Sequence, residues 1–196
     1  MTSLTPPDMS EIQPEDGWST ITMPFGTRGG SSFVDGDPDG HRLRTKMFVR
    51  DEDRHVFAKV WWGPQAEGPP GHGHGGSMAA VLDHNMGIAG WISGHPVVAA
   101  SITINFHRSI PLGEIYTVET WVDRVEGKKV YSEGRIYLDD FEKPYSSGTG
   151  LFIIQPMEKF IGLAEASRHV PGNFDTVRDE MNATQESHSP LEAEQT

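Results

Sequence analysis

The stretch GPPGHGHGGSMAAVLDHNMGIAGWIS, residues 68–93, decides the fold, because a glycine-rich turn there leads directly into a helical pattern. Apolar residues follow the turn at the i, i+3, i+4, i+7 spacing of an amphipathic helix. They are Met78, Val81, Leu82, Met86, Ala89 and Ile92. We therefore expect one long helix in the middle of the chain, since no other strong helical pattern occurs before residue 157.

Strand-like sequence lies on both sides of this helix. Before it, residues 43–50 and 55–63 form a predicted hairpin joined by the charged turn DEDR. After it come four runs that alternate apolar and polar residues. These runs are residues 97–108, 114–125, 128–140 and 145–154. The order predicts an α+β fold, in which a curved, mostly antiparallel sheet of about six strands wraps around one long central helix.

Length and composition bound the possible classes of protein. A chain of 196 residues suits one domain with extensions, or a subunit that completes its core by oligomerising. Because the chain has no cysteine, disulfide scaffolds, thiolate zinc sites and cysteine nucleophiles are excluded. The N-terminal sequence resembles neither a secretory signal nor a transit peptide, and no run approaches the roughly 20 apolar residues of a membrane span. We expect a cytoplasmic protein.

The net charge of −12 is concentrated at the two ends of the chain. Residues 1–40, rich in Pro, Gly, Ser and Asp, are expected to form an extended acidic N-terminal arm. Residues 166–196 are polar and acidic, and too poor in apolar residues to offset the entropy of ordering, so we expect a mobile tail. The folded domain is predicted over residues 41–165. Since this middle part is nearly neutral, nucleic acid is a poor partner.

The glycine-rich turn carries the first candidate functional group. Four of the six residues 71–76 are glycine, so the backbone amides there are unusually accessible. A helix N-terminus has unpaired N–H groups and a partial positive charge, so amides near Gly75 and Gly76 could hold a carbonyl oxygen that becomes an oxyanion. The alternative, that the glycines only allow a tight strand-to-helix turn, stays open at this point.

Asp83 is the second candidate, because it is a carboxylate within an otherwise apolar helix. A buried carboxylate is costly, and such positions are enriched in catalytic groups; the alternative is an Asp on the exposed helix face. Asp83 lies seven residues beyond Gly76, which is roughly 10 Å along the helix axis. It is therefore too far away to act on a carbonyl held by the same helix. Two antiparallel helices in a two-fold dimer would bring Asp83 to the Gly75 region of the partner.

Taken together, these motifs resemble the hotdog-fold acyl-CoA thioesterases of the PaaI-like group. The resemblance rests on His74-Gly75-Gly76 with Asp83 at this spacing, and on the strand ITINFHRSIPLGE, the hairpin EGKKVY and the closing YSSGTGLFI. The GPPG run before the glycine turn is particularly similar to thioesterase superfamily members 4 and 5. The resemblance covers residues 43–155 and implies that the predicted domain is a hotdog thioesterase domain.

In that family, an acidic residue on the central helix activates water or attacks the thioester. The resemblance therefore implies this role for Asp83, and it implies that the amide of Gly75 from the adjacent subunit polarises the carbonyl. His74 matches the family histidine that shapes the oxyanion site, and Gly76 is a candidate second amide. The implied function is hydrolysis of acyl-CoA thioesters by a homodimer or a dimer of dimers, with the substrate along the subunit interface and with no cofactor or metal.

The sequence departs from the family pattern at two positions. A Ser or Thr that often orients the water is replaced by Ala99, and an Asn found in some relatives is replaced by Gly68. Ser101 and Thr103 are the nearby hydroxyls, and we include them as candidate substrate-binding residues.

Basic residues near strand ends are candidates for contacts with a coenzyme A phosphate. Arg108 and Lys128 are the strongest, ahead of Arg124 and Lys129, although surface bases are more often simply solvated.

Three other functions remain as alternatives. Five histidines between residues 72 and 107 could indicate a metal site, but they lack a recognised ligand spacing such as HExxH. A hotdog dehydratase acting on 3-hydroxyacyl thioesters would pair a His base with an acidic partner, which fits this pattern less well than hydrolysis does. A non-catalytic acyl-CoA-binding protein would account for Ala99 and for the acidic arm and tail.

Overall fold

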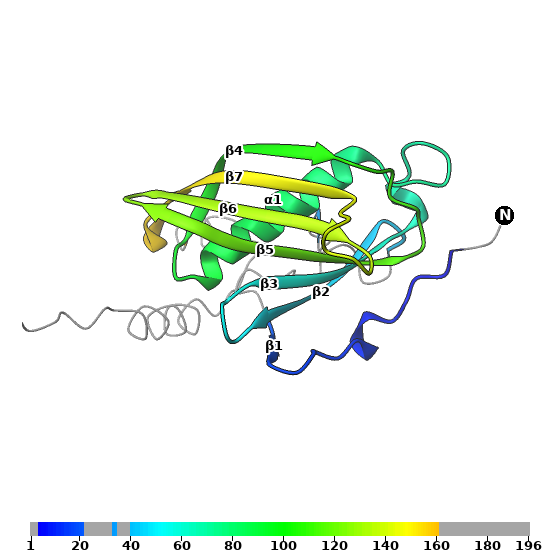
Figure 1. The fold of residues 1–196 in the computed structure, drawn as a ribbon, viewed down its shortest axis with the longest axis horizontal. Coiled ribbons are helices and arrows are strands. Elements are labelled where there is room, and N and C mark those ends of the chain that lie inside the picture. The colour runs from blue at the N-terminus through cyan, green and yellow to red at the C-terminus, as the bar shows by residue number, and fades with distance from the viewer. Residues whose placement is uncertain (1–3, 22–32, 35–39, 161–196) are drawn as a thin grey trace, which may run out of the picture.

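A computed structural model of the chain describes residues 4–21, 33–34 and 40–160. The predicted tail, residues 166–196, lies outside the described residues, as does much of the predicted arm. The predicted domain, residues 41–165, extends past the last described residue, so its C-terminal boundary stays a prediction. In the described part, one long helix packs on one face of a broad antiparallel sheet (Figure 1).

The sheet has seven strands in the order β1-β2-β3-β5-β6-β7-β4. The elements are β1 (Trp18–Thr20), β2 (Leu43–Arg50), β3 (Val56–Trp62), α1 (Gly75–Ile92), β4 (Val97–Phe106), β5 (Ile115–Glu126), β6 (Lys129–Tyr137) and β7 (Ser146–Ile154), with short 3-10 helices η1 (Met9–Glu11) and η2 (Pro64–Ala66). The helix and the six predicted strands are confirmed, the strands as β2 to β7. The described part has one strand more than expected, because β1 pairs with β2.

Strand β1 comes from the segment that we predicted as an extended arm. Its three residues pair antiparallel with the end of β2. The indole of Trp18 stacks on the ring of Phe57, with a centroid distance of 3.9 Å, and Lys59 Nζ lies 3.5 Å from a carboxylate oxygen of Glu15. These contacts hold the arm against the sheet face that α1 does not cover.

The core lies between α1 and the facing side of the sheet. The helix buries Met78, Val81, Leu82, Asn85, Met86, Ile88, Ala89 and Gly90. A glycine on the sheet allows this close packing, since a Cβ added at Gly134 would lie 3.1 Å from a methyl of Leu82. On the same face, a Cβ added at Gly148 would lie 2.7 Å from a methyl of Ile104 on the neighbouring strand β4. Each fully buried aliphatic side chain stabilises the fold by about 1.5–3 kcal/mol. The helix axis is therefore fixed relative to the sheet.

Strand β4 is an edge of the sheet, since β7 is its only neighbour among the described strands. Most of its side chains are exposed, and the exposed fraction of the apolar side chains is 39% for Val98, 39% for Ile102 and 54% for Phe106. An unpaired, apolar edge of this kind is a template for pairing with another chain. The structure therefore leaves one long edge of the sheet without a partner in the described part of the chain.

Candidate active site

The glycine turn ends in a capped helix N-terminus. His74 is the N-cap of α1, and its ring Nδ1 accepts a hydrogen bond from the N–H of Gly76 at 2.9 Å. Within the described part of the chain, the N–H of Gly75 has no hydrogen-bond acceptor. The first amides of a helix have no intrahelical partner and carry partial positive charge. Gly75 is thus the donor that remains available to a ligand, while the ring of His74 occupies the donor of Gly76.

Backbone hydrogen bonds hold the turn in place. The N–H of His74 donates to the carbonyl of Ala66 at 2.7 Å, and the N–H of Gly73 donates to the carbonyl of Ile110 at 2.8 Å. A Cβ added at Gly73 would lie 2.9 Å from Trp62 Cδ1, which is closer than real Cβ contacts, so this glycine is needed for the approach. Both roles considered for the glycines in the sequence therefore apply. The glycines allow a tight turn, and they leave the amide of Gly75 accessible.

Asp83 lies two turns further along α1 and is half-buried. Its Oδ1 is fully buried and has no hydrogen-bond partner among the described residues. Burial raises the pKa of the Asp83 carboxyl, and the nearby His84 opposes this effect only in part. A half-buried carboxylate with an unpartnered oxygen has the environment expected of a catalytic base.

The carboxylate and the amide do not meet within one chain. Gly75 and Asp83 are eight residues apart on a continuous helix, which is about 12 Å along the axis. A Cβ added at Gly75 would lie 3.6 Å from the ring of Phe106, at the end of the open edge strand β4. The candidate oxyanion donor therefore lies beside the unpaired edge of the sheet.

A cavity of about 420 Å³ lies beside the helix N-terminus. It is bounded by the turn on one side and by β2 and η2 on the other. Its lining residues are Phe33, Arg42, Leu43, Gln65, Ala66, Glu67, His74, Gly76 and Ser77. The sequence did not indicate Phe33 as part of this cavity; Arg42, which also lines it, donates a hydrogen bond to the carbonyl of Phe33 at 3.0 Å.

The register of β4 and β7 shows which side chains of β4 face α1. Ile104 pairs with Gly148, whose added Cβ would contact Ile104 and Leu82, so this row faces the helix. Ser101 and Thr103 are offset from Ile104 by odd numbers of residues, so they lie on the opposite face. Both line a groove with Arg124 and Tyr131. Within one chain, the structure does not bring these two hydroxyls to Asp83.

Ala99 lies on the other side of an irregularity in β4. The register shifts between Ala99 and Ser101, and Ala99 pairs with Phe152, which belongs to the core. Cross-strand partners share a face, so Ala99 lies on the face that carries α1. A methyl group, with no hydroxyl, occupies that position.

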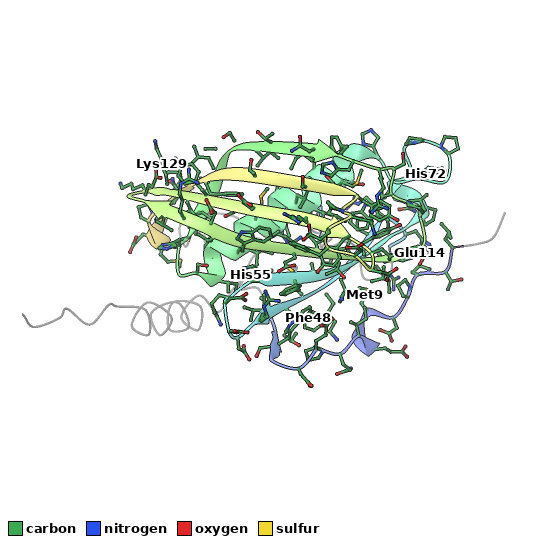
Figure 2. The ribbon with its side chains drawn as sticks, in the orientation of Figure 1. Met9, Phe48, His55, His72, Glu114 and Lys129 are labelled. Carbon is green, nitrogen blue, oxygen red and sulfur yellow. The ribbon has the colours of Figure 1, made fainter. Side chains whose placement is uncertain are left out.

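The two basic candidates lie in different places. Arg108 packs over the ring of Tyr145, with 4.0 Å from its guanidinium carbon to the ring centroid, and it donates to the carbonyl of Lys143. It lines a groove of about 540 Å³ on the sheet face away from α1. Lys128 belongs to the β5–β6 turn. Figure 2 shows that Lys129, the first residue of β6, and His72 of the glycine turn lie at opposite ends of the molecule.

The histidines in the described part of the chain form no metal-binding cluster. Among the described residues, no group of three or more His, Asp or Glu side chains has an arrangement that could hold a metal ion. His74 serves as the helix cap, and the ring of His107 lies 2.9 Å from the hydroxyl of Ser147 on the outer face.

The structure also contains a buried polar cluster that the sequence did not indicate. Glu119 on β5 is 7% exposed, and its Oε1 lies 2.8 Å from Nδ1 of His55. Tyr137 donates to the other oxygen of Glu119 at 3.4 Å, and burial raises the pKa of this tyrosine. The cluster joins the β2–β3 connection to β5 and β6 on the sheet face away from α1, so it supports the sheet and is not part of the glycine turn.

Comparisons with known proteins agree with this geometry. Residues 70–144 match the thioesterase superfamily. The chain is 32% identical over 127 residues to acyl-coenzyme A thioesterase THEM4 of Bos taurus, covering 65% of this chain and 52% of that protein. It is 30% identical over 146 residues to acyl-coenzyme A thioesterase THEM5 of Mus musculus, covering 71% and 59%. The aligned region thus spans little more than half of these relatives.

A solved structure supports the fold. A thioesterase superfamily protein of known crystal structure matches with a TM-score of 0.53 and 31% identity, covering 56% of this chain and 53% of that one. The expected hotdog architecture is confirmed, with seven strands and one long helix in the described residues. In the described part of the chain, no helix is both long and apolar enough to cross a membrane.

Proposed function

Since the chain carries a thioesterase superfamily domain, we propose that it hydrolyses acyl-CoA thioesters to a free acid and coenzyme A. One observation carries the proposal: the half-buried carboxylate of Asp83, with an oxygen that has no partner in the described part, lies on the helix whose N-terminus leaves the Gly75 amide accessible. A base and an oxyanion donor are the two groups that acyl transfer to water requires.

The proposed reaction uses both groups on the same thioester. The N–H of Gly75 donates to the carbonyl oxygen, which gains negative charge as the carbon is attacked. Asp83 takes a proton from the attacking water, or attacks the carbon itself to form an anhydride that water then hydrolyses. In both routes the C–S bond breaks and coenzyme A leaves as its thiol or thiolate. The raised pKa of Asp83 makes it a stronger base than an exposed Asp.

We propose that the site is completed by a second copy of the chain. Asp83 and Gly75 are too far apart on one helix, and the edge of β4 exposes the apolar side chains of Ile102 and Phe106, of which Phe106 lies beside Gly75. Antiparallel pairing of two β4 edges about a two-fold axis would run the two helices in opposite directions. Asp83 of each subunit would then face the glycine turn of the other, in a homodimer or a dimer of dimers.

The same pairing gives the basic candidates a role. The β5–β6 turn lies at the end of the sheet remote from the glycine turn, so an antiparallel partner brings its Lys128 toward the turn. We propose that Lys128 of the partner subunit and Arg108 contact the phosphates of coenzyme A. Roles for Ser101 and Thr103 in substrate binding, and a cytoplasmic location, stay predictions.

A second candidate function is acyl-CoA binding without hydrolysis. The observation that favours it is Ala99, which lies on the helix side of the sheet and provides no hydroxyl to orient a water molecule. Asp83 and the Gly75 amide would then bind the thioester without turning it over.

The experiment that separates these functions is thiol release from a panel of short, medium, long and aromatic acyl-CoAs, with Asp83→Asn beside the wild type. We expect at least one substrate to be hydrolysed, and the variant to be slower by about 10²–10⁴-fold because it keeps the shape of the carboxylate without its basicity. Saturable binding without release from any substrate would select the second function. Equal hydrolysis by both proteins would refute the role of Asp83.

A further inference from the structure

We propose that Ser77 and Trp62 are positioning residues that set the direction of the Gly75 amide. This inference rests on the proposed function, in which that amide is the oxyanion donor. Trp62 lies in β3 and Ser77 in the first turn of α1. Neither side chain contacts the reacting atoms in the proposed reaction, and neither belongs to the motif of His74-Gly75-Gly76 and Asp83.

The contacts form a short relay of hydrogen bonds. The indole Nε1–H of Trp62 donates to the hydroxyl oxygen of Ser77 at 3.0 Å. That hydroxyl donates in turn to the carbonyl oxygen of His74 at 2.6 Å. The N–H of Ser77 donates to the same carbonyl at 2.9 Å, so the oxygen of His74 accepts two hydrogen bonds from one residue.

The peptide unit that receives these bonds is the one that carries the candidate oxyanion donor. The carbonyl of His74 and the N–H of Gly75 belong to one planar trans peptide, in which they point in opposite directions. Fixing the direction of the carbonyl therefore fixes the direction of the N–H. Hydrogen bonds accepted by the carbonyl also polarise the peptide, which makes its N–H a stronger donor.

Trp62 is well suited to orient Ser77 because its side chain is packed on all sides in the core. Its side chain is completely buried, and its ring packs edge-on against Tyr116 with centroids 5.5 Å apart. Gly73 packs against its Cδ1, so the ring also contacts the glycine turn directly. A rigid donor in the core thus orients Ser77, which is half-buried and otherwise has three rotamers to choose from.

The test uses variants that remove single hydrogen bonds. Ser77→Ala removes the hydroxyl, Ser77→Thr keeps it, and Trp62→Phe keeps a buried ring without its N–H. Trp61→Phe is the matched control, because Trp61 is 1% exposed and its side chain lies on the opposite face of the same strand. Steady-state hydrolysis of the best acyl-CoA substrate is measured for each variant and for the double variant Trp62→Phe/Ser77→Ala.

We expect Ser77→Ala to lower kcat by about ten-fold with little change in KM, because the amide acts mainly on the charge that develops in the transition state. Trp62→Phe should lower kcat by about three-fold, and the double variant should be no slower than Ser77→Ala, since the two residues act through one path. Ser77→Thr should restore most of the rate, and Trp61→Phe should behave as wild type. Additive losses, or equal losses in Ser77→Ala and Ser77→Thr, would overturn the relay.

A second measurement tests the hydrogen bond between Trp62 and Ser77 independently of the proposed function. In protein labelled with ¹⁵N-tryptophan, hydrogen exchange of the Trp62 indole N–H is followed by NMR in the wild type and in Ser77→Ala. Faster exchange of this one indole in the variant supports the relay, and unchanged exchange refutes it. If the wild type hydrolyses no acyl-CoA, the proposed function fails while the exchange result still decides whether the hydrogen bond exists.

Discussion

The glycine turn and Asp83 belong to the start and the middle of α1, but they differ in their hydrogen bonding. At the turn, the ring of His74 caps the N–H of Gly76, and backbone bonds from His74 and Gly73 tie the loop to its neighbours. At Asp83, a buried carboxylate oxygen has no partner among the described residues. The turn keeps its shape through hydrogen bonds within the described chain, whereas the described residues supply no hydrogen-bond partner for Oδ1 of Asp83.

This difference supports the proposal that the site is divided between two subunits. A buried carboxylate oxygen without a hydrogen bond is unfavourable unless a water, a substrate or another chain satisfies it. The open edge of β4, with Ile102 and Phe106 exposed, is the place where a second chain can add. The glycine turn of one subunit would then present the Gly75 amide to the Asp83 carboxylate of its partner.

The largest effect is expected from removing the accessible N–H of Gly75 in the glycine turn. Gly75→Pro deletes the N–H at the first helical position, where proline is favoured, and His74 already has the extended ψ of 135° that a following proline requires. We expect kcat to fall by about 10²–10³-fold while the fold persists. The measurement is thiol release together with a circular dichroism melt.

Gly75→Ala is the control for this variant. It keeps the N–H, and its Cβ would lie 3.6 Å from the ring of Phe106, an ordinary contact. If alanine is as damaging as proline, the amide is not the functional group at this position.

The role of the β4 edge in pairing with a second chain can be tested by adding a charged side chain to this strand. Ile102→Lys puts an ammonium on the helix side of β4. We expect it to convert the proposed dimer to a monomer and to lower activity by about ten-fold or more, since an unpaired charge in an apolar contact is costly. Asn105→Lys adds the same charge to the opposite face of the strand and should leave the dimer intact. Light scattering after size exclusion gives the mass. A dimeric, active Ile102→Lys would argue against pairing through β4.

The smallest effect concerns stability at Asp83. Because burial raises the pKa of this carboxyl above its ordinary 3.8, the folded protein favours the protonated form. The stability gained from that proton is complete below about pH 3.8 and is lost as the pH rises through the raised pKa. At pH 7, Asp83→Asn should therefore unfold at slightly higher denaturant than the wild type, with the difference shrinking toward pH 4. A wild type that is the more stable protein at pH 7 would show that Asp83 is stabilised by partners after all.

Local patterns in the sequence predicted most of the fold. The spacing of Val81, Leu82 and Met86 indicated the helix, and alternation indicated six strands, because both patterns reflect which side chains are buried. Strand β1 was not predicted, because Trp18 and the two residues after it form a run too short to show alternation. Their position depends on contact with Phe57, which lies far away in the sequence.

The candidate site was predicted less completely, and the reasons are geometric. Gly75 and Asp83 stood out because a glycine-rich helix start and a carboxylate in an apolar helix are visible in sequence. The faces of Ala99 and Ser101 were not readable, because the register shift between them changes which side chains point toward α1. Ser77 was missed because its importance depends on Trp62, which is adjacent only in the folded chain.

The most direct test of a divided site is a purified heterodimer of Asp83→Asn and Gly75→Pro chains, isolated through two different affinity tags. If each site takes its carboxylate from one subunit and its amide from the other, the heterodimer has one site with both groups intact and one with neither. We therefore expect about half of the wild-type kcat, although each parent homodimer is nearly inactive. A heterodimer no more active than its parents would contradict a divided site, because both groups would then have to come from the same chain.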